Sequence, residues 1–90
     1  MDERQNRIFE RVAPIALEHG SGDSKRVAPE THFVNDLGFD SLTSVEFVMA
    51  IEDAFGVRVP EELVPQLQTV GQVVDWLAEQ EERRGEPGTQ

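Results

Sequence analysis

The chain has 90 residues, of which 38% are hydrophobic, so it has the length of one small domain with a single core. Eighteen acidic residues against eight basic ones give a net charge of −10, which argues against binding to nucleic acid or to an anionic membrane surface. The chain has no cysteine, which excludes disulfides, thiolate metal sites and a thiol nucleophile. No apolar run is long enough for a membrane span or a signal peptide, so we expect a cytoplasmic protein.

The first segment, residues 2–18, has the periodicity of an amphipathic helix. Its apolar residues recur on one stripe, with charges opposite: Ile8, Phe9, Val12, Ile15 and Ala16. Pro14 lies on the solvent side of this stripe, and because proline has no N–H, we expect the helix to bend or to end there. The glycine- and serine-rich stretch 20–24 is the predicted stop signal.

A long loop follows the first helix and runs to about Asp40. A loop of this length in a small domain is typically functional or internally packed, and we expect Val27 and Phe33 to anchor it in the core. His19 and His32 are expected to lie in loops, and we expect neither to bind a metal.

The second helix is predicted over residues 41–55, with Gly56 as its stop signal. Asp40 and Ser41 are both natural N-cap residues, so the sequence leaves the choice between them open. Residues 57–60 are too short for a strand and are expected to form a connector.

Two further helices complete the chain. A short one opens at residues 60–63 and is expected to be limited by Pro65. A last one, capped by Thr69, is predicted over residues 70–82 from its apolar periodicity. Residues 83–90 contain glycine, proline and charge and are expected to form a flexible tail, which leaves 1–82 as the domain. The sequence therefore predicts an all-α protein, a small helical bundle without a real strand.

The second helix has two faces that both contain apolar residues. At about 100° per residue, one stripe faces the core: Phe47, Val48, Ile51, Ala54 and Phe55. The opposite face combines three apolar residues with three acids: Leu42, Val45, Met49, Glu46, Glu52 and Asp53. These residues either cover a neighbouring segment or form a binding surface on which apolar contacts hold a partner and carboxylates steer it.

The charge distribution bears on the same surface. Between residues 27 and 57 the chain has no lysine or arginine, and residues 36–62 carry seven acids and one arginine, a net charge of −6. This acidic stretch is either a solvated face that keeps the protein soluble or a docking surface for basic partners.

Ser41 stands at the start of the second helix, where a serine ordinarily serves as an N-cap. No catalytic residue is expected, because the chain has no G-x-S-x-G motif and only two histidines. The acidic residues around it do not have the spacing of a calcium loop, so no metal site is expected. The remaining interpretation is a modification site, since a helix N-terminus accommodates a phosphate ester.

The letters DLGFDSL at residues 36–42, followed by VEFVMAIE at 45–52 and FGVRVP at 55–60, resemble the acyl carrier proteins. The resemblance extends from about Ile8 to Leu77 and implies an up-and-down four-helix bundle with a short third helix. It also implies a carrier, not an enzyme, with 4'-phosphopantetheine attached to Ser41 from coenzyme A by a phosphopantetheinyl transferase. The thiol of that cofactor carries acyl groups as thioesters.

By the same resemblance, Asp40 helps to present Ser41 to the transferase. The recognition face for loading, synthase and transferase enzymes with basic docking patches would comprise Leu42, Val45, Glu46, Met49, Glu52 and Asp53. The core and a cavity for the acyl chain would be lined by Phe33, Phe47, Ile51, Phe55, Val73 and Leu77.

These residues lead us to expect a freestanding, monomeric carrier for fatty-acid or polyketide-type biosynthesis. Two alternatives remain open: a carrier for an amino acid or another specialised starter, and an unmodified acidic adaptor whose second helix binds a protein. The strong acidity of the chain favours an acyl carrier over an amino-acid carrier.

Overall fold

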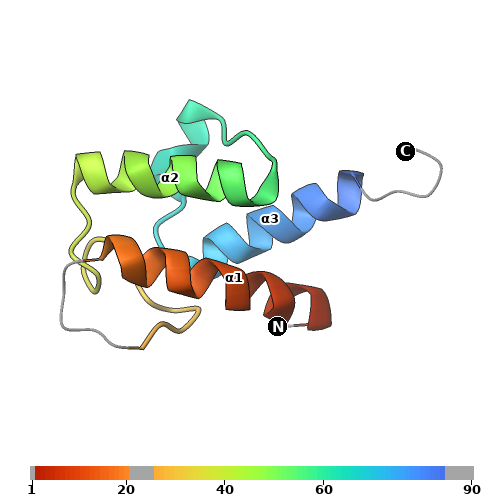
Figure 1. Cartoon of the computed structure of the whole chain (residues 1–90), viewed down its shortest axis with the longest axis horizontal. Helices are drawn as coiled ribbons and strands as arrows, with labels where there is room; N and C mark the ends of the chain where they lie inside the picture. The colour runs from red at the N-terminus through yellow and green to blue at the C-terminus, as the bar shows by residue number, and fades with distance from the viewer. Residues whose placement is uncertain (1, 21–25, 85–90) are drawn as a thin grey trace.

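The structure is a computed structural model that describes residues 2–20 and 26–84. Within these residues it has four helices (Figure 1): α1 (Glu3–His19), α2 (Ser41–Phe55), the 3₁₀ helix η1 (Glu61–Gln66) and α3 (Val70–Arg84). The only β-type pairing in the described part of the chain is an isolated bridge between His32 and Thr69. The predicted all-α bundle with a short third helix is therefore confirmed.

Helix α1 packs against both α2 and α3 and runs in the opposite direction to both (Figure 1). It buries Ile8, Val12 and Ala16. The core is completed by residues of the loop, α2 and α3: Phe33, Leu37, Phe39, Phe47, Ile51, Val70, Val73, Val74 and Leu77. Three of these core residues come from the loop before α2: Phe33, Leu37 and Phe39. No helix in the described ranges is long and apolar enough to cross a membrane.

Helix α1 passes through Pro14 without ending. The Asp2 carboxylate accepts a hydrogen bond from the Gln5 N–H at 2.8 Å, and the Gln5 side chain accepts one from the Asp2 N–H at 2.9 Å, which closes a capping box. Pro14 is exposed, and the buried Ala16 follows it, so packing against the core holds the helix beyond the proline. The expectation that the helix ends at Pro14 is therefore wrong. The expectation that His19 lies in a loop is also wrong, because His19 is the last residue of α1.

The buried side of α2 is narrower than predicted. Ala54 is exposed, and its predicted place in the core is wrong. The apolar core does not extend over this end of α2, where α1 contacts the helix through an exposed cation: Arg11 donates a hydrogen bond to the Ala54 carbonyl at 2.7 Å. The Arg11 guanidinium also lies 4.1 Å from the centre of the half-buried Phe55 ring. Gly56 ends the helix at φ 64°, the left-handed conformation that glycine adopts most readily.

The two later helices are longer than predicted. Helix η1 begins at Glu61 and continues through Pro65 to Gln66. Helix α3 continues to Arg84, two residues beyond its predicted end, and Thr69 caps it as expected, with its hydroxyl accepting from the Gln72 N–H at 3.3 Å. The rest of the predicted tail, residues 85–90, lies outside the described residues, as do residues 21–24 of the predicted stop signal.

The loop between α1 and α2 is bonded through its backbone to the first turn of α3. The Val70 N–H donates to the Thr31 carbonyl at 3.0 Å, and the Gly71 N–H donates to the Pro29 carbonyl at 2.8 Å. The first N–H groups of a helix have no partner within that helix, and here loop carbonyls accept them. The approach is so close that a Cβ at residue 71 would lie 2.9 Å from the Pro29 oxygen. Residue 71 therefore has to be glycine.

Stability measurements can test which side of α2 is buried and which is exposed. Ile51 is 2% exposed and Met49 is 60% exposed. We predict that Ile51→Ala lowers the free energy of unfolding by about 2–5 kcal/mol, because it leaves a cavity in the core. Met49→Ala should change it by less than about 0.5 kcal/mol. Thermal and denaturant melts of the two variants provide the comparison. Equal losses would contradict the structure, because both sides of α2 would then be buried.

Candidate functional site

A compact turn over residues 32–38 leads to the start of α2. The Asp36 carboxylate accepts a hydrogen bond from the His32 N–H at 2.7 Å. The His32 Nδ1 in turn accepts from the N–H groups of Val34 at 3.2 Å and Asn35 at 3.1 Å. His32 lies in the loop, as predicted, and its ring nitrogen satisfies the backbone of this turn. In the described ranges no group of three histidine, aspartate or glutamate side chains is placed to hold a metal ion.

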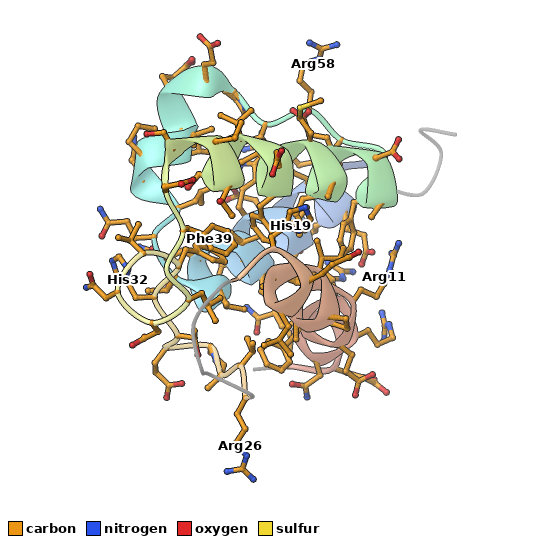
Figure 2. The ribbon with its side chains drawn as sticks, turned by 60° about the vertical axis from the view of Figure 1, so that its left-hand side comes forward. Arg11, His19, Arg26, His32, Phe39 and Arg58 are labelled. Atoms are coloured by element: carbon orange, nitrogen blue, oxygen red, sulfur yellow. The ribbon has the colours of Figure 1, made fainter. Side chains whose placement is uncertain are left out.

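Two phenylalanines fasten this turn to the core. The Phe33 N–H donates to the Gln68 carbonyl at 2.9 Å, and the Phe39 N–H donates to the Phe33 carbonyl at 2.9 Å. Gly38, at φ 71°, lets the chain reverse between them. Figure 2 shows Phe39 beneath the first turns of α2, pointing into the interior of the bundle. The buried rings thereby fix where the chain emerges at Asp40.

Asp40 is the N-cap of α2. Its carboxylate accepts a hydrogen bond from the Thr43 N–H at 2.8 Å, which decides between the two capping residues that the sequence allowed. This hydrogen bond stabilises the charged carboxylate and lowers the pKa of Asp40 below its ordinary value. Ser41 is thus the first residue of the helix and is exposed, and among the described residues its hydroxyl has no hydrogen-bond partner. The cap leaves the serine oxygen available for chemistry.

The electrostatic environment of Ser41 suits a phosphate ester. The first turn of α2 contains no acidic side chain, and the N–H groups at a helix N-terminus carry partial positive charge. A phosphate attached to Ser41 would therefore sit at the favourable end of the helix dipole.

A cleft of about 550 Å³ opens beside Ser41, between the start of α2, η1 and the loop. Its polar lining comprises Asp40, Ser41, Ser44, His32 and Gln68, and its apolar lining comprises Phe33, Val34, Phe39, Val45, Phe47, Val48, Val64, Pro65, Leu67 and Val73. The resemblance placed six residues in the core and the cavity. Three of them, Phe33, Phe47 and Val73, line this cleft. The other three belong to the core or pack against it, away from the cleft: Ile51, Phe55 and Leu77.

The predicted recognition face is largely exposed. Leu42, Val45 and Met49 are 66%, 54% and 60% exposed, so they do not cover a neighbouring segment. The two carboxylates of Glu46 and Asp53 are exposed beside them. This side of α2 is therefore accessible to a partner protein.

Glu52 has a structural partner that the sequence did not reveal. It is half-buried, and its Oε2 accepts a hydrogen bond from the Val59 N–H at 2.8 Å. The carboxylate thus holds the connector after α2 against the helix. No local pattern links residues seven positions apart across a helix end, so only the folded structure reveals this contact.

A helical bundle with an exposed serine at the N-terminus of its second helix, next to an apolar cleft, has the features of a carrier for a covalently attached arm. Residues 8–77 match the family described as the phosphopantetheine attachment site. Over 72 residues the chain is 42% identical to an acyl carrier protein of Caulobacter vibrioides (strain NA1000 / CB15N), a match that spans 80% of this chain and 92% of that protein. The chain belongs to the acyl carrier protein family, whose cofactor is 4'-phosphopantetheine. Such a protein is a carrier and not an enzyme.

The residues present fit this cofactor. The site combines a serine oxygen without a partner in the described chain, a helix N-terminus to face a phosphate, and an adjoining apolar cleft. When bound, the cofactor supplies a thiol, which the polypeptide lacks.

The N-cap produces a pH dependence with a definite sign. Because the pKa of Asp40 in the folded protein is lowered from its ordinary value of 3.8, the carboxylate stabilises the fold above that pH. We predict that this stabilisation is lost as the pH falls below 3.8 and through the lowered pKa. Thermal melts across this range should show a steeper loss for the wild type than for Asp40→Asn. The exposed Asp53→Asn, at the other end of α2, is the matched control and should follow the wild type. Equal slopes for wild type and Asp40→Asn would contradict the capping role.

Proposed function

We propose that Ser41 is the attachment site of the 4'-phosphopantetheine and that the chain is a monomeric carrier of acyl thioesters. The observation that carries this proposal is the division of roles at the start of α2. Asp40 performs the capping and leaves Ser41 exposed, beside the cleft and with its oxygen unbonded to any described residue.

The attachment requires Ser41 to act as a nucleophile towards coenzyme A. The Ser41 Oγ forms a bond to the phosphorus that bears the pantetheine, and the bond from that phosphorus to the bridging oxygen breaks. Adenosine 3',5'-bisphosphate leaves with the electron pair, and the hydroxyl proton goes to a base of the phosphopantetheinyl transferase. The carboxylate of Asp40, kept ionised by the Thr43 N–H, lies next to the serine and contributes to the surface that the transferase reads.

Recognition by partner enzymes is assigned to the exposed side of α2. Leu42, Val45 and Met49 offer apolar contact area, and Glu46 and Asp53 offer charge. The net charge of −6 over residues 36–62 supports partners with basic docking patches, because opposite charges accelerate association. We assign these partners to acyl-loading, synthase and transferase enzymes of fatty-acid or polyketide-type biosynthesis.

The alternatives receive less support. An unmodified adaptor would use the same face of α2 but would give no role to a phosphopantetheine site, and the family match is to such a site. A carrier for an amino acid would share the serine and the bundle, but the net charge of −10 and the similarity to an acyl carrier protein favour acyl cargo.

The proposal predicts a single modified residue. Incubation of the wild-type chain with coenzyme A and a phosphopantetheinyl transferase should add the mass of one phosphopantetheine group, read by intact-mass spectrometry. Ser41→Ala should add nothing and keep its helical circular dichroism, because Asp40 supplies the cap.

Ser44→Ala is the matched control, because Ser44 lines the same cleft one turn along α2. This variant should be modified like the wild type. A mass gain on Ser41→Ala, or its loss on Ser44→Ala alone, would overturn the assignment.

A further inference from the structure

Three buried aromatic rings line the cleft beside Ser41. The ring centroids of Phe33 and Phe47 lie 4.8 Å apart, those of Phe33 and Phe39 lie 5.2 Å apart, and those of Phe39 and Phe47 lie 5.4 Å apart. Each of the three side chains is at most 5% exposed. All three line the cleft and belong to the core, so this cluster of Phe33, Phe39 and Phe47, the aromatic wall, forms, together with Val73, the part of the cleft lining that is continuous with the core.

The aromatic wall is supported from three parts of the fold. Phe33 and Phe39 come from the loop, whose backbone is bonded to the segment before α3 and to itself, and Phe47 comes from α2. Behind Phe47, the His19 ring meets it edge-on with centroids 6.2 Å apart, while the His19 Nδ1 is hydrogen-bonded to the Ile15 carbonyl at 2.9 Å. Figure 2 shows His19 and Phe39 both directed into the space beneath α2. Because the three rings contact one another and are buried in a close-packed core, a movement of one ring requires its neighbours to move as well.

The composition of the cleft sets the direction in which a chain would enter it. The polar residues Asp40, Ser41 and Ser44 lie at the start of α2, and of the residues that η1 and the segment after it contribute, Val64, Pro65 and Leu67 are apolar and Gln68 is polar. A chain tethered at Ser41 would start among polar residues and reach the apolar lining. The buried part of that lining includes the aromatic wall, because Phe33, Phe39 and Phe47 are lining residues that belong to the core.

We propose that the aromatic wall limits the length of acyl chain that this carrier can shelter. The cleft takes short acyl groups, and the distal carbons of long-chain acyl groups stay in solvent. The inference rests on the proposed function at Ser41 and adds the class of its cargo, a short acyl thioester. Phe39 is the ring chosen for the test, because it contacts both other rings and stands next to Asp40 and Ser41 in the chain.

The test uses the full chain loaded from acyl-coenzyme A thioesters by a phosphopantetheinyl transferase. The acetyl, hexanoyl, decanoyl and hexadecanoyl forms are verified by intact mass, and their thermal midpoints are compared. Apolar area that is buried only in the folded state raises the midpoint. We expect the midpoint to rise from acetyl to hexanoyl and then to stay level through hexadecanoyl.

Substitution of Phe39 tests whether this ring sets the limit on acyl chain length. In Phe39→Leu the rise should continue to the decanoyl form, because the smaller side chain opens the wall. Phe55→Leu is the matched control, since Phe55 lies at the other end of α2 against Arg11 and does not line the cleft. It should keep the wild-type dependence on chain length.

The outcomes separate this inference from the proposed function. If none of the four thioesters loads on Ser41, the proposed function is overturned and the inference with it. Normal loading followed by a midpoint that rises continuously from acetyl to hexadecanoyl would overturn the inference alone. A Phe39→Leu series identical to the wild type would also overturn the role of the aromatic wall. If Phe39→Leu does not fold, the dependence of the wild-type thermal midpoint on acyl chain length tests the inference alone.

Discussion

The attachment of the long loop to the first turn of α3 is the constraint on which the site depends. A helix begins with N–H groups that its own backbone cannot satisfy, and a loop leaves carbonyl groups that need donors. Here these groups bond to each other, because the N–H groups of Val70 and Gly71 donate hydrogen bonds to the carbonyls of Thr31 and Pro29. The loop is thereby held along a definite path although it contains no regular helix or strand.

This path has consequences at the site. It brings Phe33 and Phe39 into the core from either side of one compact turn, and the chain then emerges at Asp40. Asp40 caps α2, so Ser41 stands at the helix N-terminus with its hydroxyl directed to no described partner. If Ser41 is the attachment residue, as proposed, it has to be exposed and yet held in one place, and the buried loop anchors provide the second condition. The same rings line the cleft, so the anchoring of the serine and the shape of the cleft have one physical origin.

Much of this organisation could be predicted from the sequence. The periodicity of apolar residues located the helices, because burial of one face is what stabilises an amphipathic helix. The opposition of Ile51 and Met49 on α2 followed from the helical repeat alone, and their exposed fractions agree with it. The DLGFDSL motif led to the proposal of Ser41 as the attachment residue by resemblance, and the family match covers the segment that contains it.

The details that sequence reasoning missed depend on contacts between distant segments. Pro14 predicted an interruption, but the local cost of a proline is outweighed by packing of the residues around it. Ala54 has a core position on the helical wheel, yet it is exposed, because the core ends before it and α1 contacts this end of α2 through the exposed Arg11. Glu52 was read as a surface charge, and its bond to the Val59 N–H exists only because the chain turns back after Gly56. Each case involves a partner that the spacing of residues within one helix cannot reveal.

The central claim, that loop carbonyls hold the start of α3 and with it the serine-bearing turn, is tested most directly by amide hydrogen exchange followed by NMR. Amides in the first turn of a helix ordinarily exchange fast because they lack acceptors. The account predicts slow exchange for Val70 and Gly71, comparable to Ile51 in the core of α2. The amide of Ser41, for which the described chain offers no acceptor, should exchange fast and is the internal reference. Exchange of Val70 and Gly71 as fast as that of Ser41 would contradict the account, because the loop would then not be held where the site requires it.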